Sequence, residues 1–130
     1  MKKVDFSQNY YKNVLVLAYL GDSVFTLMVR KYLVMNYNLK ARELNKIANS
    51  VVCAKTQAEI MNLLKDQLCE DELDIVMRAR NAHINSKAKH STLHEYSLAT
   101  QFEALLGYWY LNGDNEKLDN MFVNFVKERL

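Results

Sequence analysis

Proline is absent from this 130-residue chain, and glycine occurs only at positions 21, 107 and 113. An all-β chain of this length needs many turns, and tight turns depend on these two residues. Their scarcity therefore excludes most β folds and predicts an all-α protein. We expect a single domain over residues 1–130, because this length suffices for one hydrophobic core but not for two large ones.

Apolar residues repeat at helical spacing and predict about six helices. The clearest run covers residues 11–35, where alternating spacings of four and three predict a buried stripe. The stripe consists of Val14, Ala18, Gly21, Phe25, Met28, Tyr32 and Met35. Further helices are expected over residues 41–50, 54–68 and about 71–81, between Thr92 and Gly113, and after Asp114.

Each later helix has its own expected inner face. These faces comprise Ile60, Leu63, Leu64 and Leu68; Leu73, Val76 and Met77; Leu98, Phe102, Leu105 and Trp109; and Leu118, Met121, Phe122, Phe125 and Val126. The cluster Asp71, Glu72 and Asp74 fits a first helical turn, where carboxylates complement the helix dipole.

Composition narrows the class of protein further. Half of the residues are apolar and a quarter are charged, as in folded soluble proteins. No apolar run approaches the roughly 20 residues of a membrane span, and the first residues lack a signal-peptide pattern, so a cytoplasmic protein is expected. Cys53 and Cys69 do not have zinc-site spacing and are expected to be small buried apolar residues.

Two acids lie beside apolar stripes and not at the centre of a polar face. Asp22 follows Ala18 by one turn, and Glu103 lies one turn from both Ala99 and Gly107. Small residues let two helices approach closely, so both carboxylates are expected to be partly buried and to converge in one pocket. Gly21 supports this packing, since a glycine within a helix costs about 1 kcal/mol relative to alanine.

Converging carboxylates repel each other unless a cation lies between them. Oxygen ligands suit Mg²⁺, with Mn²⁺ as a possible substitute, and Mg²⁺ keeps several waters and takes up phosphate oxygens. The residue pattern alone leaves an ordinary helix-edge salt bridge equally open for each acid.

A basic segment favours the metal interpretation. Between residues 78 and 90 the chain has four cations and no acid, and the segment beyond residue 82 reads as a surface loop. The candidate RNA-binding residues are Arg78, Arg80, Asn81, Lys87 and Lys89. These residue types are suited to bind the phosphates and 2′-hydroxyls of an A-form duplex. The alternative is that the segment is an ordinary solvent-exposed turn that does not bind RNA.

Two strings resemble the ribonuclease III family. Residues 17–25 read LAYLGDSVF, similar to its Glu-Phe-Leu-Gly-Asp-Ser/Ala signature, and residues 100–107 read TQFEALLG, similar to its second acidic helix. Ala18 and Thr100 stand where the family has two further acids. The small Mini-ribonuclease III branch shares this reduced set, as well as the strings at residues 54–59 and 78–82, and lacks a separate double-stranded-RNA-binding domain.

The resemblance implies a homodimeric endoribonuclease without a nucleotide cofactor. Asp22 and Glu103 would be the catalytic and metal-holding acids, and Tyr96, Ser97 and Thr100 would line the active-site rim. The implied substrate is duplex RNA, in particular stems that flank the 5′ and 3′ ends of precursor 23S ribosomal RNA, cut to leave 5′-phosphates and 3′-hydroxyls.

Other functions stay open on the residues alone. Ala18 and Thr100 keep a non-catalytic RNA-binding or ribosome-associated protein as the alternative, and a helical dimerisation module without RNA is a third. The histidines at 83, 90 and 94 lack a metal-ligand spacing. The aromatic residues Tyr19, Tyr96, Tyr108, Trp109 and Tyr110 are expected in core or dimer packing in preference to base stacking.

Overall fold

The computed structural model describes residues 13–82 and 92–130. They form six α-helices, which confirms the predicted all-α class: α1 (Val14–Asn36), α2 (Ala41–Val51), α3 (Ala54–Leu64), α4 (Glu70–Asn81), α5 (Leu93–Leu111) and α6 (Asn115–Met121). A 3-10 turn (Lys65–Gln67) follows α3, and a π-helical turn (Phe122–Val126) and a 3-10 turn (Lys127–Arg129) follow α6. None of the helices in these two ranges is long and apolar enough to cross a membrane.

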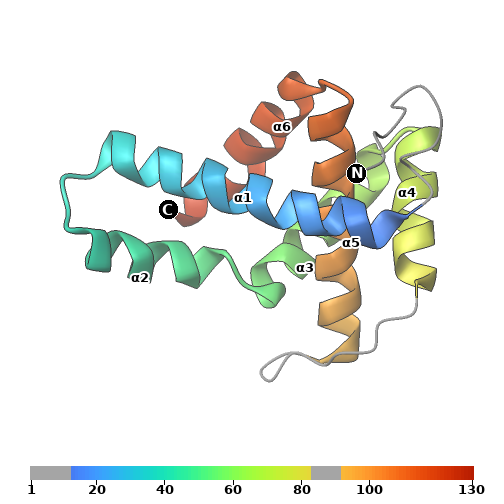
Figure 1. The fold of residues 1–130 in the computed structure, drawn as a ribbon, viewed down its shortest axis with the longest axis horizontal. Coiled ribbons are helices and arrows are strands. Elements are labelled where there is room, and N and C mark those ends of the chain that lie inside the picture. Colours follow the sequence, from blue (N-terminus) through green and yellow to red (C-terminus); the bar gives the residue numbers. More distant parts are fainter. Residues whose placement is uncertain (1–12, 83–91) are drawn as a thin grey trace, which may run out of the picture.

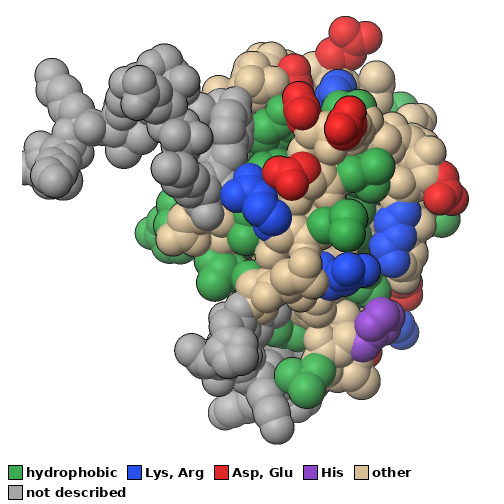
Figure 2. Space-filling model, turned by 90° about the vertical axis from the view of Figure 1, so that its right-hand side faces the viewer, with side chains coloured by type: hydrophobic (Ala, Val, Ile, Leu, Met, Phe, Trp, Pro, Cys, Tyr) green, Lys and Arg blue, Asp and Glu red, His purple; other side chains and the backbone are tan. Residues whose placement is uncertain are grey.

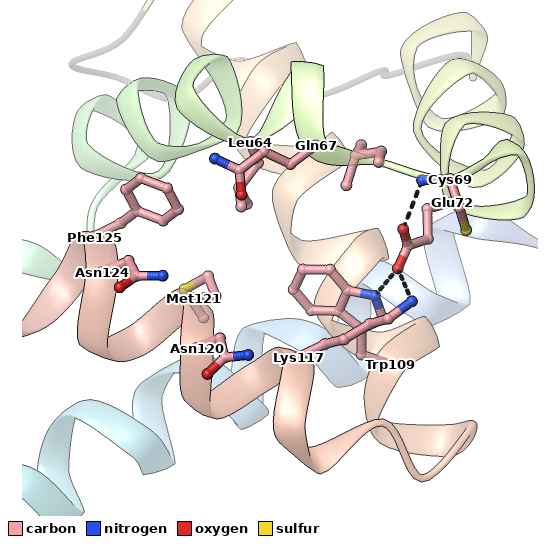
Figure 3. Close-up of a pocket in the computed structure, with 11 residues that line it drawn as sticks. Leu64, Gln67, Cys69, Glu72, Trp109, Lys117, Asn120, Met121, Asn124 and Phe125 are labelled. Atoms are coloured by element: carbon pink, nitrogen blue, oxygen red, sulfur yellow. Dashed lines mark hydrogen bonds and ion pairs between the residues drawn. The ribbon is translucent and has the colours of Figure 1, made fainter.

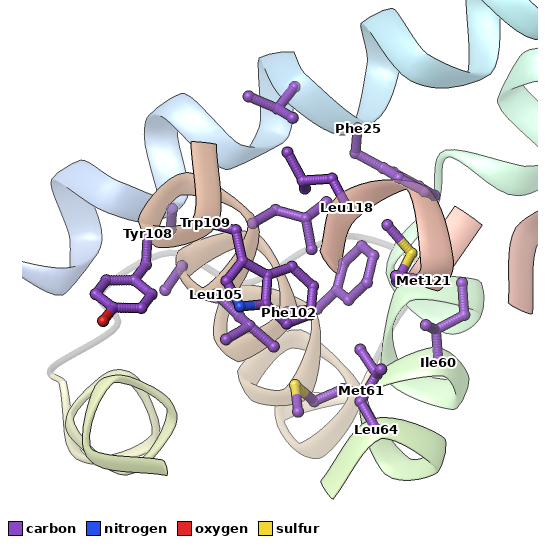
Figure 4. Close-up of a cluster of buried hydrophobic side chains, with 14 of the residues drawn as sticks. Phe25, Ile60, Met61, Leu64, Phe102, Leu105, Tyr108, Trp109, Leu118 and Met121 are labelled. Atoms are coloured by element: carbon purple, nitrogen blue, oxygen red, sulfur yellow. The ribbon is translucent and has the colours of Figure 1, made fainter. Parts of the chain in front are cut away.

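Helix α5 is the centre of the fold. It crosses behind α1 in Figure 1 and packs against α1, α3 and α4, while α6 lies beside its carboxyl end. The predicted inner residues Leu98, Phe102, Leu105 and Trp109 are all buried. Figure 4 shows the aromatic side chains of α5 among Ile60, Met61, Leu64, Leu118 and Met121 from α3 and α6. Phe25 meets the Phe102 ring edge to face, with centroids 5.1 Å apart, a favourable geometry for aromatic pairs.

Local sequence signals set the helix ends. The Asn13 side chain accepts hydrogen bonds from the backbone amides of Leu15 and Val16 and so caps α1. Thr92 accepts from the amide of Glu95 at 3.0 Å, as the predicted capping box requires. Helix α5 ends before Gly113, whose φ of +74° is the left-handed conformation that glycine tolerates best.

The predicted stripe on α1 is fully buried only in its first half. Val14, Ala18, Gly21 and Phe25 are buried, Met28 and Tyr32 are half-buried against the core, and Met35 is exposed. The buried line continues instead through Val29 and Leu33, because the second half of α1 leaves α5 and packs against α2. These two helices form an arm that projects from the body of the molecule (Figure 1). We call residues 27–51 the α1–α2 arm.

Three other burial predictions are wrong. Leu63 is exposed, and its neighbour Met61 is buried in its place. Leu73 and Met77 are exposed, and α4 turns Glu72, Ile75, Val76 and Ala79 inward. Cys69 is exposed, whereas Cys53 is half-buried and donates from Sγ to Thr56 Oγ1 at 3.4 Å. For the leucines and the methionine the apolar spacing admitted two neighbouring faces, and packing against α5 selected one of them, whereas Cys69 is exposed because it lies at the N-cap before α4.

Candidate active site

Helices α1 and α5 cross at backbone contact. A Cβ atom placed on Gly21 would lie 1.7 Å from the carbonyl oxygen of Glu103, and one on Gly107 would lie 2.1 Å from the carbonyl oxygen of Leu17. No side chain fits at either position, so both glycines are required by close packing. The predicted reason for Gly21 inside a helix is therefore confirmed.

This crossing brings Asp22 and Glu103 together. Asp22 follows Gly21 on α1, and its carboxylate and that of Glu103 are close enough to share a hydrogen bond. Glu103 is half-buried as expected, but Asp22 is exposed, which corrects the prediction that it is partly buried. The buried line of α1 passes through Gly21 and Phe25, so the side chain of Asp22 points away from the core towards solvent.

The electrostatics of the pair favour a bound cation. Burial, the hydrogen bond with Asp22 and the negative charge of Asp22 together raise the pKa of Glu103 from 4.5 to about 8. Without a cation, the pair therefore holds one proton near neutral pH. A divalent ion that replaces this proton would relieve the repulsion between the two carboxylates.

The two acids are not part of a larger set of ligands. Within residues 13–82 and 92–130, no group of three or more histidine, cysteine, aspartate or glutamate side chains is placed to hold a metal ion. Ala18 and Thr100 are buried, and the Thr100 hydroxyl donates to the carbonyl oxygen of Tyr96 at 3.0 Å. A metal ion here would have two carboxylate ligands and would complete its shell from water and substrate phosphate.

The other predicted site residues lie in two places. Tyr96 and Ser97 are half-buried one to two turns before Glu103 on α5, with the buried Thr100 between them and Glu103. Arg78, Arg80 and Asn81 lie on the last turns of α4, where Arg78 forms an ion pair with Asp74 at 3.2 Å. The remaining candidates, Lys87 and Lys89, and the histidines at 83 and 90 lie outside the described residues, as does the start predicted for the first helix at residue 11.

Glu72 has a structural role that the sequence analysis missed. It is only 3% exposed, and its carboxylate accepts hydrogen bonds from Trp109 Nε1 at 2.5 Å, Lys117 Nζ at 2.7 Å and the amide of Cys69 at 2.9 Å. These contacts close one side of a hollow of about 240 Å³ between α3, α4 and α6 (Figure 3). The spacing of Glu72 from Ile75, Val76 and Ala79 is the signal that could have placed it on the inner face.

Comparison with known proteins identifies the family. Residues 15–114 match the model of the ribonuclease III domain. The chain is 44% identical to the Mini-ribonuclease 3 of Brevibacillus brevis over 82% of this chain and 79% of that protein. It is 35% identical to the Mini-ribonuclease 3 of Staphylococcus aureus over 90% and 91% of the two chains. The chain belongs to the ribonuclease III family.

A solved structure supports the same assignment. A crystal structure of a protein from Fusobacterium nucleatum matches 98% of this chain and 100% of its own with a TM-score of 0.84 and 30% identity. Members of the ribonuclease III family are endoribonucleases, and the predicted enzyme class is therefore confirmed. The acids Asp22 and Glu103 both lie within the matched region.

Proposed function

We propose that this ribonuclease III-family chain is a Mg²⁺-dependent endoribonuclease that cuts double-stranded RNA, with Asp22 and Glu103 as its catalytic and metal-holding acids. The observation that carries the proposal is the meeting of these two carboxylates at the crossing of α1 and α5. Because the backbones of α1 and α5 are in direct contact, the positions of both acids are fixed, and a metal-dependent active site needs this rigidity.

Each residue has a defined part in this mechanism. Asp22, on the exposed side of the crossing, would bind the ion where RNA can reach it, and the half-buried Glu103 would hold the ion from the helix behind. When bound, Mg²⁺ would supply an activated water for attack on the phosphodiester and stabilise the leaving 3′-oxygen. Arg80 and Asn81, exposed at the end of α4, would bind the RNA backbone together with Lys87 and Lys89.

The proposed substrate is more specific than duplex RNA in general. The chain resembles Mini-ribonuclease 3 proteins over most of its length, and this resemblance supports stems flanking the 5′ and 3′ ends of precursor 23S ribosomal RNA as the cellular target. Cleavage would leave 5′-phosphates and 3′-hydroxyls, and the enzyme would act in the cytoplasm, where that precursor is made.

A homodimer completes the proposal. Helix α1 exposes large apolar side chains along one side, including Tyr19 at 82% and Leu27 at 65% exposed. Two hollows of about 410 and 500 Å³ lie between α1 and α6 and share Met28, Lys31 and Asp119 in their walls. Adjoining hollows with mostly apolar walls on a small protein are typical of a protein–protein interface, and we propose a second copy of the chain as their occupant.

The test is a cleavage assay on duplex RNA with Mg²⁺, comparing the natural chain with Asp22→Asn and Glu103→Gln. Both variants should lose activity by about a hundredfold or more while still binding the duplex, because a metal ligand is lost and the basic residues remain. Glu116→Gln, which alters an exposed acid on α6, is the matched control and should cleave normally. A model 23S precursor stem should be cut at defined sites.

A second readout separates the metal site from a structural salt bridge. The folded pKa of Glu103, about 8, lies above its ordinary value of 4.5, so between these pH values Glu103 is protonated in the folded chain and ionised in the unfolded chain, and stability falls as pH rises from 4.5 to 8. In EDTA at pH 8, Glu103→Gln should therefore melt at a higher temperature than the natural chain. Mg²⁺ should stabilise the natural chain and leave the variant nearly unchanged.

The alternative is an RNA-binding protein without catalysis. The observation that favours it is the presence of Ala18 and Thr100, neither of which can bind a metal through a carboxylate. A natural chain that binds duplex RNA but never cuts it, with either Mg²⁺ or Mn²⁺, would establish this alternative and overturn the enzyme mechanism.

A further inference from the structure

The α1–α2 arm carries a group of five exposed cations. Between residues 30 and 50 the chain has five cations and one acid. The cations are Arg30, Lys31, Lys40, Arg42 and Lys46, and all five are exposed. None of them forms an ion pair with any residue in the ranges 13–82 and 92–130, whereas Arg78, Lys117 and Arg129 elsewhere each have an acidic partner.

The single acid of this segment is engaged at a helix end. The Glu43 carboxylate accepts a hydrogen bond from the backbone amide of Lys40 at 3.3 Å, in the first turn of α2. Arg42 and Lys46 are one turn apart, on the side of α2 opposite the buried Ala48 and Val51. The outer side of α2 is therefore a ridge on which cations outnumber acids, and its one carboxylate is oriented towards the start of the helix.

The charge of the ridge differs from that of the opposite end of the molecule. Figure 2 views the molecule from the end opposite the arm, where acidic side chains gather in the upper part and lysine and arginine side chains lie across the middle. Mixed charges of this kind are ordinary for a soluble protein. Cations of one sign on a projecting arm repel each other, and a polyanion lying along them would remove that repulsion.

The length of the arm decides how these cations can act. Asn36, at its tip, is 14 residues beyond Asp22 on the same helix, which corresponds to about 20 Å at 1.5 Å per residue. The Debye length at physiological salt is about 8 Å, so charges near the tip have little influence on the two acids through solvent. They can contribute only by direct contact with a partner whose negative charge extends over a similar distance. A nucleic-acid duplex has this property along its whole length.

We infer that the start of α2 at Lys40 and its outer side, with Arg42 and Lys46, form a second phosphate-binding surface for the RNA duplex, separate from the basic residues at the end of α4 and beyond it. The inference rests on the proposed function for the identity of the duplex. It assigns the arm the task of holding a stretch of the substrate away from the point of cleavage. Contacts to phosphates position a duplex without reading its sequence, so the arm would contribute affinity and not specificity.

The experiment measures the affinity for duplex RNA as a function of salt concentration. It compares the natural chain with a double variant, Arg42→Ala with Lys46→Ala, and with two single variants, Lys46→Ala and Lys65→Ala. Lys65 is the matched control, because it is also an exposed lysine without an ion pair in the described ranges but lies beyond α3. Alanine has the highest helix propensity, so neither change should unfold α2, and melting temperatures verify this.

The double variant should reduce the slope of log affinity against log salt by about 2, and Lys46→Ala should reduce it by about 1. At physiological salt the KM for cleavage should rise roughly tenfold in the double variant, with kcat unchanged. Lys65→Ala should match the natural chain in every measurement.

Equal slopes in the double variant and the natural chain would overturn the inference. So would a loss of binding to vesicles of anionic phospholipid with duplex binding intact, since the ridge would then serve a membrane surface. If the natural chain binds duplex RNA through the arm but does not cut it, the enzyme proposal fails and the arm remains a phosphate-binding surface.

Discussion

Two glutamates in this protein have pKa values shifted in opposite directions. Glu103 faces Asp22, another carboxylate, and its pKa is raised to about 8. Burial also acts to raise the pKa of Glu72, but hydrogen bonds from Lys117, the Cys69 amide and Trp109 outweigh it and lower that pKa to about 2. The charge of Glu72 is thus compensated inside the fold, whereas ionised Glu103 would face a second carboxylate and is therefore disfavoured.

The shift of Glu72 predicts an acid-sensitive contribution to stability. Its folded pKa lies below its ordinary value of 4.5, so its contribution is complete above pH 4.5 and is lost as pH falls towards 2. At pH 7, Glu72→Gln should lower the free energy of unfolding by about 3 kcal/mol, and at pH 3 the difference should be much smaller. Chemical denaturation at the two pH values measures this.

Glu70→Gln is the control for this experiment. Glu70 is exposed in the same first turn of α4, and its change should cost less than about 1 kcal/mol at either pH. A Glu72→Gln variant with the same loss at pH 3 as at pH 7 would show that packing and not charge accounts for the effect.

At the scale of residues, the sequence predicted that Asp22 and Glu103 converge, but it did not predict that Glu72 is buried. Asp22 and Glu103 were selected because each lies among small residues at helical spacing and within a recognisable string. Glu72 was assigned to a dipole-stabilising first turn, although its spacing from Ile75, Val76 and Ala79 also fits the inner face of the helix. Its partners Trp109 and Lys117 are 37 and 45 residues away, so the identity of the groups that compensate the buried carboxylate leaves no local pattern.

At the scale of elements, the crossing of α1 and α5 determines both the stability of the fold and the positions of Asp22 and Glu103. The Gly21 backbone lies against the Glu103 carbonyl, and Gly107 lies against the Leu17 carbonyl. The positions of the two acids follow from these two contacts, since Asp22 adjoins one glycine and Glu103 is one turn from the other. Any widening of the crossing would separate the carboxylates as well as the helices.

Gly21→Ala tests this dependence. Alanine would stabilise an isolated helix by about 1 kcal/mol, but here its Cβ would lie 1.7 Å from a backbone oxygen that no rotamer change can move. We expect a net loss of at least about 3 kcal/mol in stability, and strongly reduced cleavage in whatever fraction still folds. Thermal unfolding and specific activity per folded molecule measure the two effects.

Gly113→Asn provides the comparison for that variant. Nothing lies within 4 Å of a Cβ at Gly113, and asparagine tolerates its φ of +74° better than other residues with side chains. Its cost should stay near 1 kcal/mol with activity unchanged. A Gly21→Ala chain more stable than the natural one would contradict the close crossing.

The existence of the helices was predictable, but some of their buried faces were not. The expected helix over residues 41–50 and the one between Thr92 and Gly113 match α2 and α5 to within about two residues, and in α5 the Thr92 cap and Gly113 mark the ends. The helix expected over residues 54–68 stops at Leu64 and gives way to a 3-10 turn. In α1 the change of partner from α5 to α2 shifts the buried line, and no local propensity encodes that shift.

At the scale of the whole molecule, the outward side of α1 is too apolar for a surface in water. Tyr19, Leu27 and Val34 are each more than half exposed, and Val123 after α6 is 59% exposed beside the hollows between α1 and α6. Burying these side chains against a second copy would gain about 25 cal/mol for each Å² of apolar area. In the proposed homodimer this gain holds together two subunits, each with its own pair of acids and its own arm.

Leu27→Glu should break that dimer. It places a charge at an exposed apolar position in the wall of the hollow between α1 and α6, where a partner would have to desolvate it, while the folded monomer leaves it in water. Light scattering coupled to gel filtration should give about 30 kDa for the natural chain, twice its 15.2 kDa mass, and about 15 kDa for the variant.

Leu63→Glu, at a 50% exposed leucine on α3, is the control and should remain dimeric. A natural chain that stays monomeric at tens of micromolar, or a Leu27→Glu chain that still dimerises, would remove α1 from the interface. If the two arms of a dimer hold one duplex, the monomeric variant should also lose duplex affinity while its metal-dependent stabilisation stays intact, because Asp22 and Glu103 belong to the same chain.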